Sequence, residues 1–562
     1  MASSARLGLA VLAIAAGPLL AACSDGGPSP TGAAITSPPP PPVAAPPPPP
    51  PPVSSAPTFT AGVFEASGEF EAQCETPRSG VDIEGNGFPD EPGSTLLENF
   101  WLRSWTNETY LWNDEVVDRD PAGFNDRLAY FAQLRTFAVE PSGEDRDDFH
   151  FSEPTEEFLA RRNSAPSASY GYSLLVFSNT PPRDYRIRYT EPDSPAAEAI
   201  MGQPQFQRGT RILEVDGVDL VNGGATQAEI DTLNNGLFPA TAGETHTFVV
   251  QDPGAASTRT VTITSADISP KPVNRFSVID TPTGKVGYLL FNTFSPFESE
   301  RDLAEAMSSL AAEGVEDLVL DLRYNGGGLL AVAAQLGYMI AGDAQTSGRT
   351  FELLRFNDDA GNVNPVTGEF NSPVPFYDTG LGFSLVNGAP LDSLDLPRVF
   401  ILSTAGTCSA SEAVINGLRG VGVSVILVGD VTCGKPYGFY PTDNCGETYY
   451  TIQFQGVNDQ GFGEYADGFV PEASSFGFGV RLPGCVVADD INTELGDTSE
   501  ALLAAALTYR DTGDCSPPAA TALAKLTPQT AYRGAEKGAL ATTAATPAED
   551  FLNNNRDMRM PY

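Results

Sequence analysis

Short apolar runs in the second half of the chain limit its fold more than any other feature. These runs are Val286–Phe291, Leu318–Leu322, Val399–Leu402 and Val423–Val428. Runs without alternation are typical of parallel strands that are covered on both faces. Between the first two lies Glu298–Glu313, whose apolar residues recur at helical spacing. Alternating strands and helices of this kind predict an α/β core over residues 267–515.

Composition restricts the partners and the chemistry. The 562 residues carry a formal net charge of −40, which repels nucleic-acid phosphates, so we expect no nucleic-acid partner. Only two histidines occur, His150 and His246, and only five lysines. A general base drawn from either residue type therefore has few candidates.

The first residues predict export. Arg6 precedes the apolar stretch Leu7–Leu20, which is short for a membrane span. The sequence Leu20-Ala21-Ala22-Cys23 resembles the lipobox of bacterial lipoproteins, which implies cleavage after a signal peptide of residues 1–22 and lipid on Cys23. We expect an exported lipoprotein on the periplasmic face of an outer membrane or at the cell surface. An ordinary cleavable signal, with Cys23 incidental, is the alternative.

Three further regions flank the predicted core. Residues 23–65 are rich in Pro, Ser, Thr and Ala and predict a lipid anchor with an extended linker. Residues 66–167 mix acidic turns with aromatic, helix-like pieces and predict a small helical N-terminal domain. The Ala-, Thr- and Pro-rich tail, residues 516–562, is predicted to be disordered.

Six cysteines follow Cys23, an even number that permits disulfides in an oxidising compartment. Among them, Cys433 and Cys445 are the closest pair that could close a loop. The pattern leaves the pairing of the others open, because six cysteines allow fifteen connectivities.

Residues 168–266 consist of short β-like runs. Ser194–Ala199 and Gly209–Gly217 lie between them, and the segment resembles a PDZ domain, in which the first phrase begins a helix and the second is a strand. The resemblance implies a groove in which an extended peptide adds as a strand. Backbone amides that would receive its carboxylate lie near Gly171, Tyr172, Ser173 and Leu174. A small β domain that binds nothing is the alternative.

Three phrases follow the predicted strands, at the strand ends where α/β sheets usually keep their sites: Asp321–Leu330, Gly406–Glu412 and Gly429–Pro436. In this order, after a PDZ-like segment, they are similar to those of the tail-specific, or C-terminal processing, serine proteases. The resemblance covers about 168–510. It implies a crotonase/Clp-like β-β-α core, with Ser409 as nucleophile, Lys435 as general base, and neither metal nor cofactor.

The chemistry agrees with this assignment. A serine hydroxyl is unreactive until a neighbour removes its proton. His150 and His246 lie outside the three phrases, whereas Lys435 follows an apolar strand, where burial would lower the pKa of its amine toward neutrality.

The charge that develops on the substrate carbonyl oxygen needs preorganised donors. Glycines at 326–328 let backbone amides approach closely, and the resemblance pairs the amide of Gly327 or Gly328 with that of Ala410 as an oxyanion hole. Three charged residues match family positions that hold the site together, with ordinary structural ion pairing as the alternative: Asp321, Arg323 and Glu412.

One position departs from the family: Phe439 stands where many members carry a Gln that orients the lysine. The expected function is that of a serine endopeptidase acting on unfolded polypeptides that are bound by their C-terminal region. Phe439 keeps open a catalytically inactive protein of the same fold that binds peptides or other ligands. An esterase is a third possibility.

Two other motifs are set aside. Gly429–Lys435 has the spacing of a phosphate-binding loop, but Pro436 stands where magnesium binding needs Ser or Thr. Asp82, Glu84 and Asn86 have the oxygen spacing of a calcium loop, but the Glu required at its twelfth position is missing. We therefore expect a solvated acidic turn there, and no metal.

Overall fold

The computed structural model describes residues 57–163, 166–200, 202–515 and 556–557. The predicted signal peptide, Cys23 and most of the predicted linker lie outside these residues, as does most of the predicted tail. Within the tail, Arg556–Asp557 form strand β29, so the prediction of disorder is wrong for these two residues.

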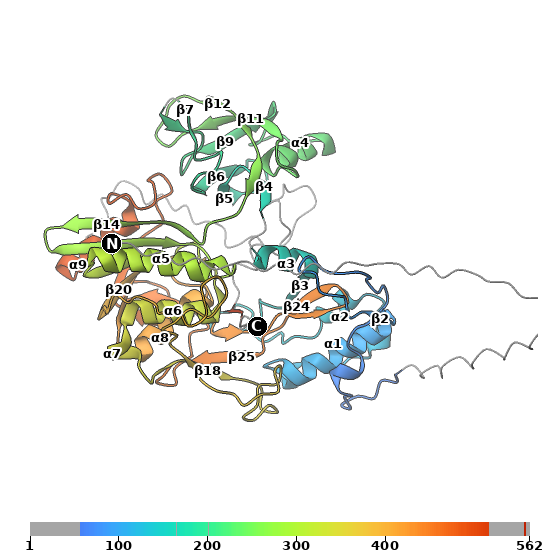
Figure 1. The fold of residues 1–562 in the computed structure, drawn as a ribbon. Helices are drawn as coiled ribbons and strands as arrows, with labels where there is room; N and C mark the ends of the chain where they lie inside the picture. The colour runs from blue at the N-terminus through green and yellow to red at the C-terminus, as the bar shows by residue number, and fades with distance from the viewer. Residues whose placement is uncertain (1–56, 164–165, 201, 516–555, 558–562) are drawn as a thin grey trace, which may run out of the picture. The chain divides into compact units, whose positions relative to one another are not determined.

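A six-stranded sheet forms the centre of the core (Figure 1). In spatial order, its strands are β14 (Val273–Thr281), β15 (Gly284–Phe291), β16 (Asp317–Asp321), β20 (Arg398–Ser403), β21 (Ser424–Gly429) and β28 (Gly484–Val486). β14 runs antiparallel to β15, and the other neighbours are parallel. The predicted α/β core with a largely parallel sheet is therefore present.

The strands are apolar throughout because both faces of the sheet are covered. On one face, Leu320 belongs to a buried cluster with helices α5 (Glu298–Glu313), α6 (Leu330–Ala341) and α8 (Ala410–Gly420). On the other face, the preceding residue, Val319, packs against helix α9 (Ala501–Thr512).

The order of the strands determines where the three sequence phrases meet. β16, β20 and β21 are consecutive in the sheet, with Leu320 opposite Ile401 and Ile401 opposite Leu427. Because the three strands are parallel, their carboxyl ends lie at the same edge. Each phrase follows one of these ends, so residues about 100 positions apart in sequence become neighbours.

A second sheet is formed by the residues between β4 (Ser167–Ser169) and β13 (Ala266–Ile268) in the sequence. β4 and β13 pair with each other where the chain enters and leaves this region. Its main path, in spatial order, is β12 (Arg259–Thr264), β11 (Thr245–Gln251), β9 (Arg211–Val215), β6 (Asp184–Thr190) and β5 (Tyr172–Ser178). Helix α4 (Gln227–Leu237) begins with a capping box between Thr226 and Glu229.

The helix predicted to begin at Ser194–Ala199 is wrong. These residues form turns that lead into the short strand β7 (Ala199–Ile200). The carbonyls of Ala196 and Glu198 accept hydrogen bonds from the amides of Phe206 and Gln205, so they do not bond along a helix.

The N-terminal region is helical, as expected, but it shares its packing with the core. Its helices are α1 (Thr95–Thr109), α2 (Arg127–Phe131) and α3 (Thr155–Arg162). Its strand β3 (Phe151–Pro154) pairs with β24 (Glu447–Tyr450), which in turn pairs with β23 (Thr442–Asn444). The small sheet of the N-terminal region is therefore completed by strands from almost 300 residues later in the chain.

Three disulfides are present among the described residues: Cys74–Cys445, Cys408–Cys433 and Cys485–Cys515. Cys433 and Cys445, the closest pair in sequence that could close a loop, are each bonded to another cysteine. Cys408 follows β20 and Cys433 follows β21, and because these strands are neighbours the two Cα atoms lie 5.2 Å apart.

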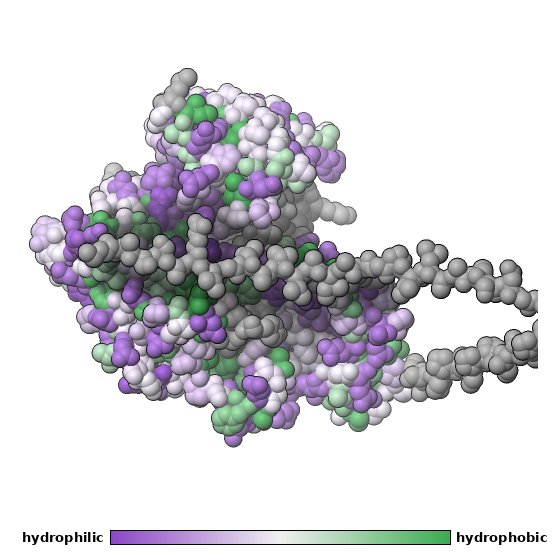
Figure 2. All heavy atoms as spheres, in the orientation of Figure 1, coloured by the Kyte–Doolittle hydropathy of each residue, from purple (hydrophilic) through white to green (hydrophobic). Residues whose placement is uncertain are grey.

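On the face drawn in Figure 2, hydrophilic and hydrophobic residues are interspersed. No helix within the described ranges is both long and apolar enough to span a bilayer.

One buried acid lies where the second sheet meets the core. Glu191 follows β6, is 7% exposed, and accepts a hydrogen bond of 3.0 Å from the backbone amide of Lys271, shortly before β14. Burial raises the pKa of its carboxyl to about 7, against the opposing effect of that hydrogen bond.

We predict that Glu191→Gln removes a pH dependence of stability. Because the pKa of Glu191 is raised on folding, the folded chain holds the proton more tightly than the unfolded chain, in which glutamate titrates near 4.5. The stabilisation is complete below that value and is lost as the pH rises through about 7. Between pH 5 and pH 8, unfolding experiments should show the wild type losing up to about 3 kcal/mol relative to the variant. Equal losses in both proteins would contradict this.

Candidate active site

Ser409 lies at the N-terminal end of α8, directly after the loop that follows β20. Its side chain is buried, and its backbone has φ 57° and ψ −111°, a conformation that residues with a side chain rarely adopt. Its amide donates a hydrogen bond of 3.0 Å to Glu412, and the amide of Cys408 donates one to the carbonyl of Asn325. These contacts help to hold the strained turn, with Ser409 at the positive end of the helix dipole.

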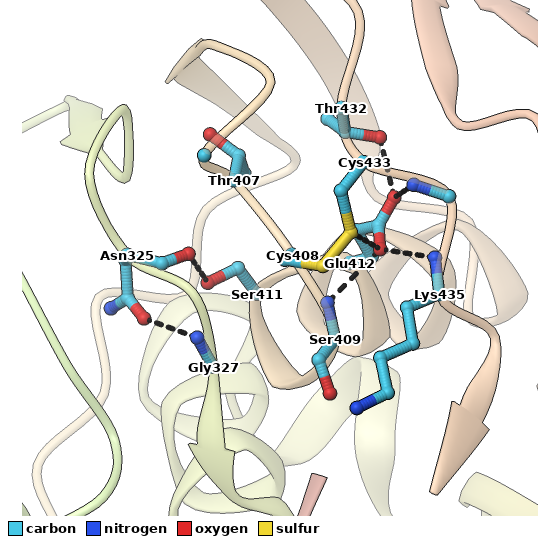
Figure 3. The surroundings of a disulfide bond; sticks show 12 residues. Asn325, Gly327, Thr407, Cys408, Ser409, Ser411, Glu412, Thr432, Cys433 and Lys435 are labelled. Atoms are coloured by element: carbon cyan, nitrogen blue, oxygen red, sulfur yellow. Dashed lines mark hydrogen bonds between the residues drawn. A yellow bond between two sulfur atoms is a disulfide. The ribbon is translucent and has the colours of Figure 1, made fainter. Parts of the chain in front are cut away.

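Lys435 is fully buried, with its Nζ between two aromatic rings. The distance from Nζ to the ring centroid is 4.4 Å for Phe149 and 4.5 Å for Phe439. Figure 3 shows the Lys435 amine and the Ser409 hydroxyl pointing toward one another. Phe439, the position that departs from the family, thus forms one wall of the space around the amine.

The carboxylate of Glu412 joins the turn that carries Ser409 to the turn that carries Lys435. Besides the Ser409 amide, it accepts hydrogen bonds from the amides of Gly434 (2.9 Å) and Lys435 (2.8 Å) and from the hydroxyl of Thr432 (2.5 Å). Burial raises the pKa of the Glu412 carboxyl, and these hydrogen bonds act in the opposite direction. Glu412 therefore positions both turns through their backbones (Figure 3).

A covalent bond joins the same two turns. Cys408 immediately precedes Ser409, Cys433 lies two residues before Lys435, and the two sulfurs form a disulfide. The ends of β20 and β21 are thus connected by the sheet, by Glu412 and by a disulfide.

The glycine-rich turn after β16 packs against the same place. Gly328 has φ 133°, and a Cβ there would lie 2.3 Å from the backbone of Phe294, so a larger residue does not fit. The side chain of Asn325 accepts a hydrogen bond from the Gly327 amide, and its backbone carbonyl accepts one from the Ser411 hydroxyl. Because the Gly327 amide already donates to Asn325, Gly328 is the better candidate for an oxyanion donor.

Ala410 is the other predicted oxyanion donor. It is the first residue of α8, and the first amides of a helix have no acceptor within the helix. An amide at this position can donate to an oxygen held next to Ser409.

Asp321 and Arg323 lie in a buried ionic network that faces α9. Arg323 donates to Asp321 (2.9 Å), to Asp489 (2.7 Å) and with both terminal nitrogens to Glu500 (2.8 and 2.9 Å). Glu500 is the N-cap residue of α9, and Arg208, in the turn before β9, also donates to Asp489. These contacts support the frame of the core, whereas Glu412 contacts the two turns directly.

Both histidines have partners elsewhere. His150 is buried, and its ring nitrogens lie 2.8 Å from the carbonyl of Phe131 and 3.1 Å from the hydroxyl of Thr451. His246 lies in the second sheet, with Nδ1 2.5 Å from Asp216. Lys435 is the basic side chain that the structure brings to Ser409.

The four residues predicted to bind a peptide lie at the start of β5, the last strand in the path of the second sheet. Among them, the Gly171 amide already donates to the hydroxyl of Ser169 (2.9 Å). The Tyr172 hydroxyl donates to the carbonyl of Leu237 at the end of α4 (2.8 Å), Leu174 is buried, and Ser173 pairs with Tyr189 of β6. These residues thus lie at the start of an edge strand, where Tyr172 contacts the end of a helix.

Two residues of the site were not predicted. Asn325 directly precedes the three glycines of the first phrase, and this position could have indicated that its side chain supports the glycine turn. Phe149 lies 286 residues before Lys435, and nothing in the local pattern connects them.

A buried serine at a helix N-terminus, a buried amine directed at it and a glycine turn beside it are the groups that a serine hydrolase site needs. Residues 285–439 match the model of peptidase family S41. This match and the 31% identity to a curated protease agree with the predicted family resemblance.

Two curated relatives agree with this. The chain is 31% identical over 281 residues to the carboxyl-terminal-processing protease of Picosynechococcus sp. strain PCC 7002, covering 50% of this chain and 58% of the relative. It is 25% identical over 350 residues to the chloroplastic C-terminal processing peptidase of Tetradesmus obliquus, covering 60% and 64%. The chain thus spans about three fifths of the length of these relatives.

The fold is also found among solved structures. A crystal structure assigned to the S41 proteases, from Bacteroides fragilis NCTC 9343, aligns with a TM-score of 0.55 at 24% identity. The alignment covers 74% of this chain and 97% of that one. This likeness supports the S41 protease fold.

We predict that Glu412→Ala destabilises the chain strongly. The substitution leaves buried donors on both turns without their acceptor, and removing one partner from such a network typically costs about 3 kcal/mol or more. Chemical denaturation measures the change. Glu472→Ala, which removes an exposed carboxylate, should change the stability by less than about 0.5 kcal/mol. Similar values for the two variants would show that Glu412 does not hold the turns.

Proposed function

We propose that the chain is a serine endopeptidase that uses Ser409 as nucleophile and Lys435 as general base. The observation that carries the proposal is the fully buried amine of Lys435 pointing toward the hydroxyl of Ser409 (Figure 3). The match of residues 285–439 to peptidase family S41 supports the same chemistry.

In the first half of the reaction, Lys435 takes the proton of the Ser409 hydroxyl while Oγ bonds to the substrate carbonyl carbon. The amides of Gly328 and Ala410 donate to the oxyanion. As the peptide bond breaks, Lys435 returns the proton to the leaving amine, which leaves an acyl-enzyme. In the second half, Lys435 deprotonates a water, the hydroxide displaces Ser409, and the proton returns to Oγ.

The lysine must be neutral to act as a base. Full burial disfavours an ammonium ion by as much as 3–5 pKa units, or roughly 4–7 kcal/mol. The ring faces of Phe149 and Phe439 act in the opposite direction, since a desolvated ring face favours a cation by about 2 kcal/mol. The aromatic walls exclude water and carry no net charge. Phe439 is thus compatible with activity.

For substrate binding, we propose that the sheet of residues 168–266 acts as a PDZ-like module that holds the C-terminal region of a polypeptide. The support is that β5 is an edge strand and contacts the end of α4. An extended peptide can add to such an edge as a further strand. The substrates would be unfolded or loosely structured chains.

We also propose export and lipid attachment at Cys23. Three disulfides among the described residues fit an oxidising compartment outside the cytosol. Metabolic labelling with a fatty acid should mark the wild type but not Cys23→Ser, and labelling of both would contradict the assignment.

We predict that Ser409→Ala and Lys435→Met each reduce cleavage of a disordered test protein by on the order of 10³-fold or more. Mass spectrometry of the products measures the loss. Lys285→Met is the matched control, because Lys285 is a surface lysine paired with Glu313, and it should cleave like the wild type. Unchanged cleavage by Ser409→Ala, or by Lys435→Met, would refute the proposed roles.

A further inference from the structure

Strand β29 is part of the chain's own tail and pairs with the glycine-rich turn of the site. Arg556 lies opposite Gly328 and Asp557 opposite Leu329, in a parallel arrangement with β17 (Gly328–Leu329). β17 begins immediately after Gly327, so the tail strand runs directly beside the residue that best fits an oxyanion donor.

The tail strand also lies beside an element that follows the lysine. β22 (Tyr437–Gly438) begins two residues after Lys435 and contacts β29. The tail backbone thus meets one element next to the oxyanion turn and another next to the proposed base. A polypeptide that is to be cut at Ser409 needs to pass through this same place.

We propose that this groove binds the chain's own C-terminal segment as an added strand, so that the tail competes with other polypeptides for the site. The proposal rests on the proposed peptidase function, and it names extended polypeptide segments as the class of ligand. Strand addition uses backbone hydrogen bonds, which do not depend on side-chain identity, so the same edge can accept the tail or a substrate.

The connection permits binding within one molecule. Forty residues, 516–555, separate Cys515 from Arg556, and an extended chain of that length spans at most about 140 Å. Reach is therefore not limiting. A ligand tethered to the protein that binds it has an effective concentration on the order of millimolar. If the tail segment binds its groove with a dissociation constant of about 0.1 mM, this effective concentration weakens the binding of a separate peptide roughly tenfold.

Three chain lengths test the proposal, each carrying Ser409→Ala so that nothing is cut. One is the full chain, one ends at Asp557 and keeps β29, and one ends at Asn555 and lacks it. The probe is a fluorescent peptide of residues 550–562 with an amidated C-terminus, because the amide removes the carboxylate that a PDZ-like module would bind. We expect the chain ending at Asn555 to bind the probe about tenfold more tightly than the other two.

Arg556→Pro in the full chain provides a check without truncation. Proline removes one backbone N–H and disfavours the strand, so this variant should bind the probe like the chain ending at Asn555. Equal affinity of all four proteins, or no binding by any of them, would overturn the proposal.

The same chains with Ser409 intact separate this proposal from the peptidase assignment. Loss of β29 should lower the KM for a disordered substrate several-fold and leave kcat unchanged. A difference in probe binding without any cleavage would refute the peptidase function alone. Cleavage with the same KM for every chain length would refute the role of the tail alone.

Discussion

The hydrogen bonds that Glu412 accepts are the interaction on which the arrangement of the site depends. A buried carboxylate is costly unless donors satisfy it, and here the donors come from the turn after β20 and the turn after β21. The same acid therefore fixes the backbone of Ser409 and the backbone of Lys435. The disulfide between Cys408 and Cys433 adds a covalent link between the same two turns. Neither contact would form without the parallel register that brings the two strand ends together.

The surroundings of the lysine come from two distant parts of the chain. Phe439 follows Lys435 closely, but Phe149 belongs to the N-terminal region, whose strand β3 pairs with β24 and whose Cys74 is bonded to Cys445. The N-terminal region thus completes the site. The buried ionic network around Arg323 acts at a different place, where it joins the sheet to α9.

Apolar spacing along the sequence correctly predicted helices and strands of the core. The helix expected at Glu298–Glu313 has those bounds, and the run Val286–Phe291 lies within β15, because apolar spacing reflects burial directly. Ser409 and Lys435 were assigned through the resemblance to a protease family, whose motifs follow the strand ends. The helix expected at Ser194–Ala199 failed because its carbonyls bond to a neighbouring segment instead. The pairing of Cys74 with Cys445 spans 371 residues, and no local rule predicts such a contact.

Labelling with a fluorophosphonate, which reacts preferentially with an activated serine, tests the central claim most directly. If Lys435 removes the proton of the Ser409 hydroxyl, peptide mapping of the labelled full chain should find one adduct, on Ser409, and the adduct should be lost in Lys435→Met. An adduct on another serine, or equal labelling of Ser409 in Lys435→Met, would contradict the account.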